Sequence, residues 1–162
     1  MIRFILVATF VILFLILSIP LLLIEWIIGR FNMGLKDRSS QKIVNWAFRV
    51  CLFLAGTSVT VIGQEKVPTD RAVLYVGNHR SYFDIVMGYT TVPAPIGFIA
   101  KKEMQKVPFI RLWMKYLHCL FMDRSNPREG LKTILSGIEQ INNGISIVIF
   151  PEGTRNKGDG II

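Results

Sequence analysis

One uninterrupted apolar run dominates the start of the chain. Residues Phe4–Ile24 carry no charged side chain, and a helix needs about 20 apolar residues to cross the hydrocarbon core of a bilayer. The pattern predicts a transmembrane or deeply embedded helix, in which Pro20 allows a kink or a re-entrant hairpin. A secretory signal peptide is the alternative, but the run is longer than such peptides need and no small-residue cleavage pattern ends it.

A second helix is predicted over residues 38–55, where polar side chains recur every three or four residues. This polar stripe consists of Arg38, Gln41, Lys42, Asn45 and Arg49. Apolar side chains cover the rest, so we expect the helix to lie at the membrane interface with its basic stripe toward lipid headgroups. An ordinary helix packed on the domain is the alternative. Residues 1–57 are therefore interpreted as a membrane anchor with an interfacial helix.

From residue 58 onward, short β-branched and aromatic runs alternate with helical periodicity, which is typical of an α/β layered domain. The predicted strands are Val59–Ile62, Ala72–Val76, Ile96–Ala100, Cys119–Met122 and Ile145–Phe150. Helix starts are predicted at Ser81, Pro108 and Asn126. The last helix is expected to end at Asn143-Gly144 and to bury an apolar face made of Leu131, Ile134, Leu135, Ile138 and Ile141.

Composition and charge narrow the class of protein. Hydrophobic residues make up 51% of the 162 residues, yet the formal net charge is +8, a combination that favours an anionic membrane surface as partner. The basic residues are dispersed and accompany no zinc-ligand or RNA-binding motif, so nucleic acid is not an expected partner. Cys51 and Cys119 have no metal-ligand spacing and are expected to be buried free thiols. Basic residues follow the apolar run more often than they precede it, which predicts a cytoplasmic active site.

The first candidate site is the stretch LYVGNHRSYFD, in which a predicted buried strand ends just before His79. The carboxyl ends of strands in α/β sheets are where ligands bind. Asp84 follows five residues later, near enough to orient the imidazole of His79, and such a pair is a minimal general base. Asp84 also fits the third position of a capping box opened by Ser81, which is a purely structural alternative.

The second candidate site is SIVIFPEGTR, another apolar strand that ends in a polar loop. Gly153 allows a ligand to approach the backbone, Thr154 offers a hydroxyl, and Arg155 has the planar donor fork that suits a phosphate monoester. Lys101 and Arg124 each follow another predicted strand. Three cations at strand ends therefore favour an anionic substrate, although each alone is more often a surface charge.

These blocks resemble the 1-acylglycerol-3-phosphate acyltransferase family, within the glycerolipid acyltransferase superfamily. The matching blocks, in the family's order and spacing, are NHRSYFD, FIAKKE, LFMDR and FPEGTR, over roughly residues 58–157. The resemblance implies a layered glycerol-3-phosphate-acyltransferase-like domain over residues 58–162. It also implies that His79 is a general base oriented by Asp84, and that the acceptor is bound by Lys101, Arg124, Glu152, Gly153, Thr154 and Arg155.

The resemblance also implies a reaction and its substrates, and the sequence departs from the family's pattern at two places. An acyl thioester, of coenzyme A or of acyl carrier protein, is expected to acylate the sn-2 hydroxyl of lysophosphatidic acid without a metal or other cofactor. The alternatives are another lysophospholipid or glycerol 3-phosphate as acceptor, or an inactive protein that binds anionic lipid. His118 stands where the family often has a glycine. The family's Val-Pro block is absent, so the domain is expected to be incomplete at its C-terminus.

Overall fold

The computed structural model describes residues 1–93 and 95–155. Its centre is a four-stranded parallel sheet in the order β1-β4-β2-β3. The strands are β1 (Leu74–Val76), β2 (Ile96–Lys101), β3 (Leu120–Met122) and β4 (Ser146–Ile149). All three strand pairs are parallel, so all four carboxyl ends meet at one edge of the sheet. The predicted α/β class is therefore confirmed.

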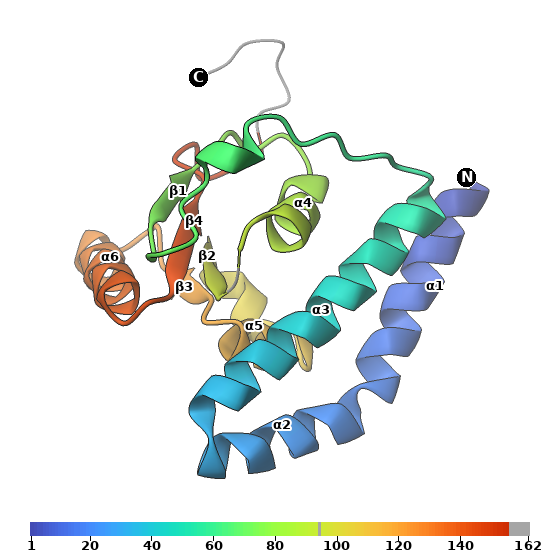
Figure 1. Cartoon of the computed structure of the whole chain (residues 1–162), viewed down its shortest axis with the longest axis horizontal. Coiled ribbons are helices and arrows are strands. Elements are labelled where there is room, and N and C mark those ends of the chain that lie inside the picture. Colours follow the sequence, from blue (N-terminus) through green and yellow to red (C-terminus); the bar gives the residue numbers. More distant parts are fainter. Residues whose placement is uncertain (94, 156–162) are drawn as a thin grey trace.

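Helices cover both faces of this sheet (Figure 1). On one face lie α4 (Phe83–Thr91) and α5 (Ile110–Tyr116), and on the opposite face lies α6 (Pro127–Asn142). Short 3₁₀ helices, η1 (Gln64–Lys66) and η2 (Lys102–Lys106), connect the larger elements. The core joins Phe98 and Val148 of the sheet to Tyr89 of α4 and Trp113 of α5.

Three N-terminal helices form the other part of the molecule: α1 (Ile2–Leu17), α2 (Ile19–Phe31) and α3 (Met33–Ala55). The long helix α3 lies between α1 and the α4–α5 layer (Figure 1). Its Gln41, a member of the predicted polar stripe, is buried and accepts the Ile96 N–H at 3.2 Å. This packing matches the alternative interpretation of residues 38–55, a helix packed on the domain.

The apolar run Phe4–Ile24 is not one continuous helix but forms two helices that meet at Ser18, a break of the kind that Pro20 was expected to allow. Pro20 lies in the first turn of α2, where its missing N–H costs no hydrogen bond. Ser18 is buried and its Oγ accepts the Trp113 Nε1–H at 2.9 Å, which ties the bend to α5. Among the described residues, no single helix meets the length and apolarity needed to cross a membrane, whereas α1 and α2 together meet them with a 50° bend.

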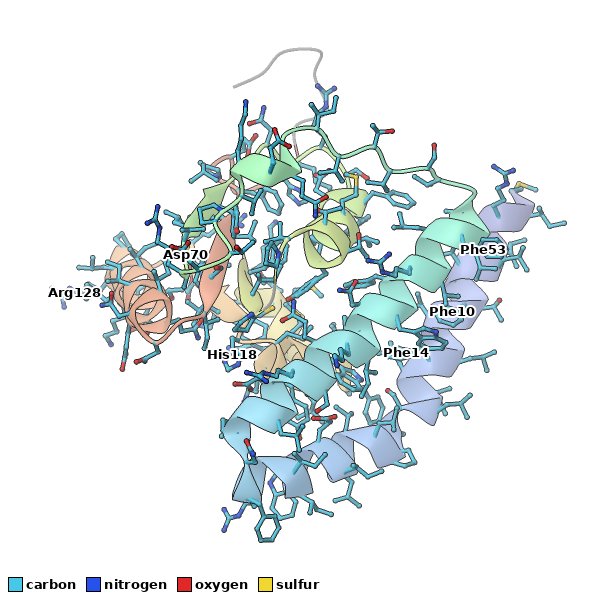
Figure 2. All side chains as sticks on the ribbon, viewed as in Figure 1. Phe10, Phe14, Phe53, Asp70, His118 and Arg128 are labelled. Carbon is cyan, nitrogen blue, oxygen red and sulfur yellow. The ribbon has the colours of Figure 1, made fainter. Side chains whose placement is uncertain are left out.

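Aromatic side chains join α1 to the rest of the molecule. Phe10 and Phe14 lie on the side of α1 that faces α3 (Figure 2). Phe10 packs edge-on against Trp46 of α3, with ring centroids 6.1 Å apart, and Phe14 stacks on Trp113 of α5 at 5.9 Å. The N-terminal helices therefore share side chains with the core of the α/β part.

Other sequence expectations were confirmed or corrected at the level of single elements. Four predicted strands form, but Val59–Ile62 does not, because no strand of residues 1–93 or 95–155 lies beside this run to share its backbone hydrogen bonds. Helix α5 begins at Ile110, two residues after Pro108. The N-cap Asn126 and the end of α6 at Asn142 agree with expectation. The loop-like residues 158–162 lie outside the described residues.

The expected burial of the apolar face of α6 is wrong. Its Leu131, Ile134, Leu135 and Ile138 are exposed. The helix instead turns its small residues toward the sheet, where Gly137 lies against the Leu120 side chain. Small residues allow a helix to approach a sheet closely, and the larger apolar side chains then point away.

Candidate active site

Two adjacent strand ends bring the first and last sequence blocks together. His79 follows the end of β1 by three residues, and Glu152 follows the end of β4 by three residues. Because β1 and β4 are parallel neighbours, the chain leaves both at the same edge of the sheet. There the His79 backbone N–H donates a hydrogen bond to Oε1 of Glu152 at 3.1 Å. Blocks that lie 73 residues apart in the chain are therefore in direct contact.

Asp84 holds the imidazole of His79 in one orientation. Its Oδ2 lies 2.9 Å from Nδ1 of His79, and the same oxygen accepts the backbone N–H groups of Arg80 and Ser81 at 2.7 and 2.8 Å. On its other side, the imidazole stacks on Phe150, with ring centroids 4.4 Å apart and planes 11° from parallel. Both side chains of the pair are only 16% exposed.

The protonation of Asp84 determines which nitrogen of His79 is free. Burial alone raises the pKa of Asp84, but hydrogen bonds from Ser81, His79 and Arg80 outweigh it, so the pKa lies below the ordinary 3.8. The carboxylate is therefore ionised at neutral pH and accepts a proton-bearing Nδ1. The opposite nitrogen, Nε2, then has a lone pair that can accept a proton.

The structural alternative for Asp84 coexists with this geometry. Ser81 begins the turn before α4, with its Oγ accepting the Phe83 N–H at 3.0 Å. Asp84 returns to the Ser81 N–H, as a capping-box residue does. One carboxylate thus both stabilises the helix start and orients the imidazole.

The loop after β4 carries the candidate anion-binding residues. Gly153 has φ +66°, and a side chain there would meet the Arg124 guanidinium at 3.2–3.6 Å. Arg124, which follows β3, therefore lies against this loop. Arg155 places its guanidinium carbon 3.9 Å from the ring centroid of Tyr82, while Thr154 is exposed.

Lys101 ends β2 with an exposed side chain, and within the described residues it forms no hydrogen bond or ion pair with the other candidate residues. Its neighbour Lys102 forms an ion pair with Asp123 at 2.8 Å. This pair, together with hydrogen bonds from Ser125, lowers the pKa of Asp123 to about 2. The ion pair links the end of β2 to the residue just before Arg124.

A cavity of about 410 Å³ lies beside this edge, between the sheet and the start of α6. Its apolar lining includes Ile99, Met122 and Ile149, and its polar lining includes Arg124 and Glu152. A second cavity, of about 210 Å³, is lined by residues that precede the strands, such as Ala72 and Pro95, and so lies at the opposite edge. In the described part of the chain, no group of three or more His, Cys, Asp or Glu side chains could hold a metal.

Three features that pack at this edge were not predicted from the sequence: the Phe150 ring, the Tyr82 ring and the ion pair Lys102–Asp123. Both aromatic residues lie inside the blocks FPEGTR and NHRSYFD, but an aromatic residue in such a block usually belongs to the core. Only the fold reveals that each ring lies against a functional side chain of the other block.

Comparison with known proteins agrees with this geometry. The sequence model of the Acyltransferase family matches residues 58–162. The chain is 31% identical over 121 residues to a 1-acyl-sn-glycerol-3-phosphate acyltransferase of Borreliella burgdorferi, covering 75% of this chain and 48% of the relative. It is 32% identical over 114 residues to the protein of the same name in Bacillus subtilis, covering 70% and 56%.

A solved structure is similar over nearly the whole chain. The crystal structure of the 1-acyl-sn-glycerophosphate (LPA) acyltransferase PlsC from Thermotoga maritima superimposes with a TM-score of 0.78 at 25% identity, covering 99% of this chain and 65% of the other. The chain spans about half the length of the curated relatives that it matches. Because the family model covers more than half of the 162 residues, this chain belongs to the acyltransferase family.

Proposed function

We propose that this chain transfers an acyl group from an acyl thioester to the free sn-2 hydroxyl of 1-acylglycerol 3-phosphate, which yields phosphatidic acid. The observation that carries the proposal is the His79–Asp84 pair at the carboxyl edge of the sheet, with Nδ1 and Oδ2 2.9 Å apart. Names of relatives support the choice of acceptor: those from Borreliella burgdorferi and Bacillus subtilis are 1-acyl-sn-glycerol-3-phosphate acyltransferases.

In the proposed reaction, Nε2 of His79 takes the proton from the acceptor hydroxyl. The hydroxyl oxygen attacks the thioester carbonyl carbon, the carbon–sulfur bond breaks, and the thiolate leaves with the proton returned by His79. Asp84 fixes the tautomer and stabilises the imidazolium. The acceptor supplies its own nucleophile, so a covalent acyl-enzyme is not required.

The cations supply the proposed site for the acceptor phosphate. Arg155 and Arg124 lie at the loop whose Glu152 contacts His79, and a planar guanidinium can form two hydrogen bonds to a phosphate. Lys101, Gly153 and Thr154 complete the proposed acceptor site. The lining of the 410 Å³ cavity combines apolar side chains with the cation Arg124, which suits one end of an amphipathic lipid.

A single variant tests the proposed base. His79→Ala should lower the rate of single-turnover acylation by about 10²–10⁴-fold, the usual contribution of general base catalysis. Affinity for lysophosphatidic acid should stay unchanged, since a base acts in the transition state. The measurement is acyl transfer from acyl-CoA and from acyl carrier protein thioesters by the whole chain in detergent micelles.

The only other histidine provides a matched control. His118→Asn should keep the wild-type rate, because His118 lies away from the carboxyl edge. A His79→Ala variant that keeps its activity would exclude His79 as the base. Binding of lysophosphatidic acid without turnover by the wild-type chain would instead favour a lipid-binding protein. Faster turnover of glycerol 3-phosphate or another lysophospholipid would identify that molecule as the acceptor in place of lysophosphatidic acid.

A further inference from the structure

At the carboxyl edge of the sheet, the blocks NHRSYFD and FPEGTR each supply an aromatic ring that packs against a polar side chain of the other block. Phe150, from the loop after β4, stacks on the imidazole of His79 at 4.4 Å. Tyr82, from the block that contains His79, lies under the guanidinium of Arg155 at 3.9 Å. Each block therefore carries one polar side chain and the ring that supports the polar side chain of the other block.

Stacking on a ring holds Arg155 in a way that an ion pair would not. A guanidinium over a ring uses its flat face, and its N–H donors at the edge stay available for other partners. A carboxylate partner would occupy those donors. Among the described residues, no carboxylate lies within ion-pair distance of Arg155. Within the described residues, the contact with Tyr82 therefore leaves the donors of the guanidinium without a carboxylate partner.

The position of Tyr82 is set by the same carboxylate that orients the base. Oδ2 of Asp84 accepts the backbone N–H groups of Arg80 and Ser81, so the backbone immediately before Tyr82 is held in place. The Tyr82 side chain is nevertheless 67% exposed. An exposed ring therefore contributes little to the core, whereas it lies directly against the guanidinium of Arg155.

We propose that Tyr82 is a positioning residue that holds the Arg155 guanidinium at a fixed place relative to His79, with its donor edge toward the acceptor phosphate. The proposal rests on the proposed phosphate-binding role of Arg155. The phosphate and the reacting hydroxyl of one acceptor are joined by only a few rotatable bonds, so fixing the guanidinium restricts where the hydroxyl can lie relative to Nε2. Tyr82 would thus favour acceptors that carry a phosphate monoester.

Two variants distinguish the contribution of the Tyr82 ring from that of its hydroxyl. Tyr82→Leu removes the stacking and should weaken the affinity for lysophosphatidic acid by about two- to five-fold, as expected for an exposed cation–π contact. Its KM for that acceptor should rise equally, while the KM for the thioester and for monoacylglycerol stays the same. Tyr82→Phe keeps the ring and should match the wild type. Phe83→Leu, one residue further, is the matched control and should also match it.

A double-mutant cycle tests whether Tyr82 acts through Arg155. In an Arg155→Ala background, Tyr82→Leu should cause no further loss of affinity for lysophosphatidic acid. The contact itself is visible by NMR, because the tyrosine ring shifts the Arg155 Nε–H resonance in the wild type and in Tyr82→Phe but not in Tyr82→Leu. Equal loss in both backgrounds, or equal loss in Tyr82→Phe and Tyr82→Leu, would overturn the proposal.

Failure of this proposal is distinguishable from failure of the proposed function. If Arg155→Ala keeps the wild-type preference for lysophosphatidic acid over monoacylglycerol, Arg155 does not bind the phosphate and the role of Tyr82 is excluded, while acylation that depends on His79 still stands. If His79→Ala stays active, the catalytic assignment is wrong, and the affinity cycle of Tyr82 and Arg155 still reports on acceptor binding.

Discussion

At the scale of single residues, Asp84 combines a contact with the His79 imidazole and contacts with the backbone before α4. One oxygen, Oδ2, accepts three hydrogen bonds: one from Nδ1 of His79 and two from the backbone N–H groups of Arg80 and Ser81. These hydrogen bonds lower its pKa despite burial, so the negative charge that fixes the histidine tautomer is present throughout the neutral range. The same bonds shape the turn that carries Tyr82. A single carboxylate therefore orders both the imidazole of His79 and the backbone next to Tyr82.

Replacing Asp84 by Asn should lower the acylation rate on the order of 10⁴-fold, because the amide favours the wrong tautomer of His79 and does not stabilise its charged form. The measurement is single-turnover acylation with circular dichroism as a check of folding. A loss of less than ten-fold, roughly 1.4 kcal/mol, would indicate that Asp84 serves only as a cap.

The same variant has an effect on stability that depends on pH. A lowered folded-state pKa contributes stability above the ordinary pKa of 3.8, and this contribution is lost as the pH falls through the folded value. The free energy of unfolding of the wild type should therefore decrease below pH 3.8 more steeply than that of Asp84→Asn. Parallel curves for the two proteins would contradict the lowered pKa.

At the scale of elements, the connection between α5 and β3 depends on His118. This residue has φ +57°, a conformation that glycine adopts without strain. Its Nε2 lies 3.0 Å from Oδ1 of Asp37 on α3, and both side chains are largely buried. Figure 2 shows His118 beside α3. A histidine at this place thus brings its imidazole against a carboxylate of α3, which is a contact between the N-terminal helices and the α/β part.

Asp37→Ala should lower the free energy of unfolding by about 1–3 kcal/mol, since it removes the carboxylate that lies 3.0 Å from the buried Nε2 of His118. Adding His118→Gly to this variant should restore most of the loss, because glycine removes both the unpaired group and the backbone strain. Denaturant unfolding of the whole chain in detergent measures both. If the double variant is less stable than Asp37→Ala, the left-handed backbone is not a source of strain.

At the scale of the whole molecule, the exposed apolar side chains include two groups on different elements. One group lies on α1 and α2 and includes Ile12, Ile16 and Leu23; the other lies on α6 and includes Leu131, Leu135 and Ile138. We propose that the bent pair α1–α2 embeds the protein in the membrane, with its active edge on the cytoplasmic side. The apolar length of the pair and the positive net charge support this.

Two triple variants distinguish these surfaces. Changing Ile12, Ile16 and Leu23 to Asn should release the protein from anionic vesicles or make it extractable by alkaline carbonate, because these side chains point away from the core. The same change at Leu131, Leu135 and Ile138 is the matched control and should leave attachment intact. Release by the control set alone would show that α6 faces the membrane.

Local patterns in the sequence were enough to predict the α/β class of the fold and to name the candidate residues of the site. Strong alternation of β-branched runs and helical periods predicted four of the strands, since such patterns are local and depend little on context. The blocks around His79, Asp84, Glu152 and Arg155 were readable for the same reason. The isolated run Val59–Ile62 failed because a strand needs a neighbour, which the local pattern cannot supply.

The contacts between these sequence blocks depend on the tertiary structure. The order β1-β4-β2-β3 makes β1 and β4 neighbours, and this alone brings Glu152 to His79 and Tyr82 to Arg155. The burial of Gln41 and the exposure of the α6 face also depended on packing, since a periodic pattern shows that a helix has two faces but not which one meets the sheet. Contacts between residues far apart in the chain are set by topology, and no local pattern encodes them.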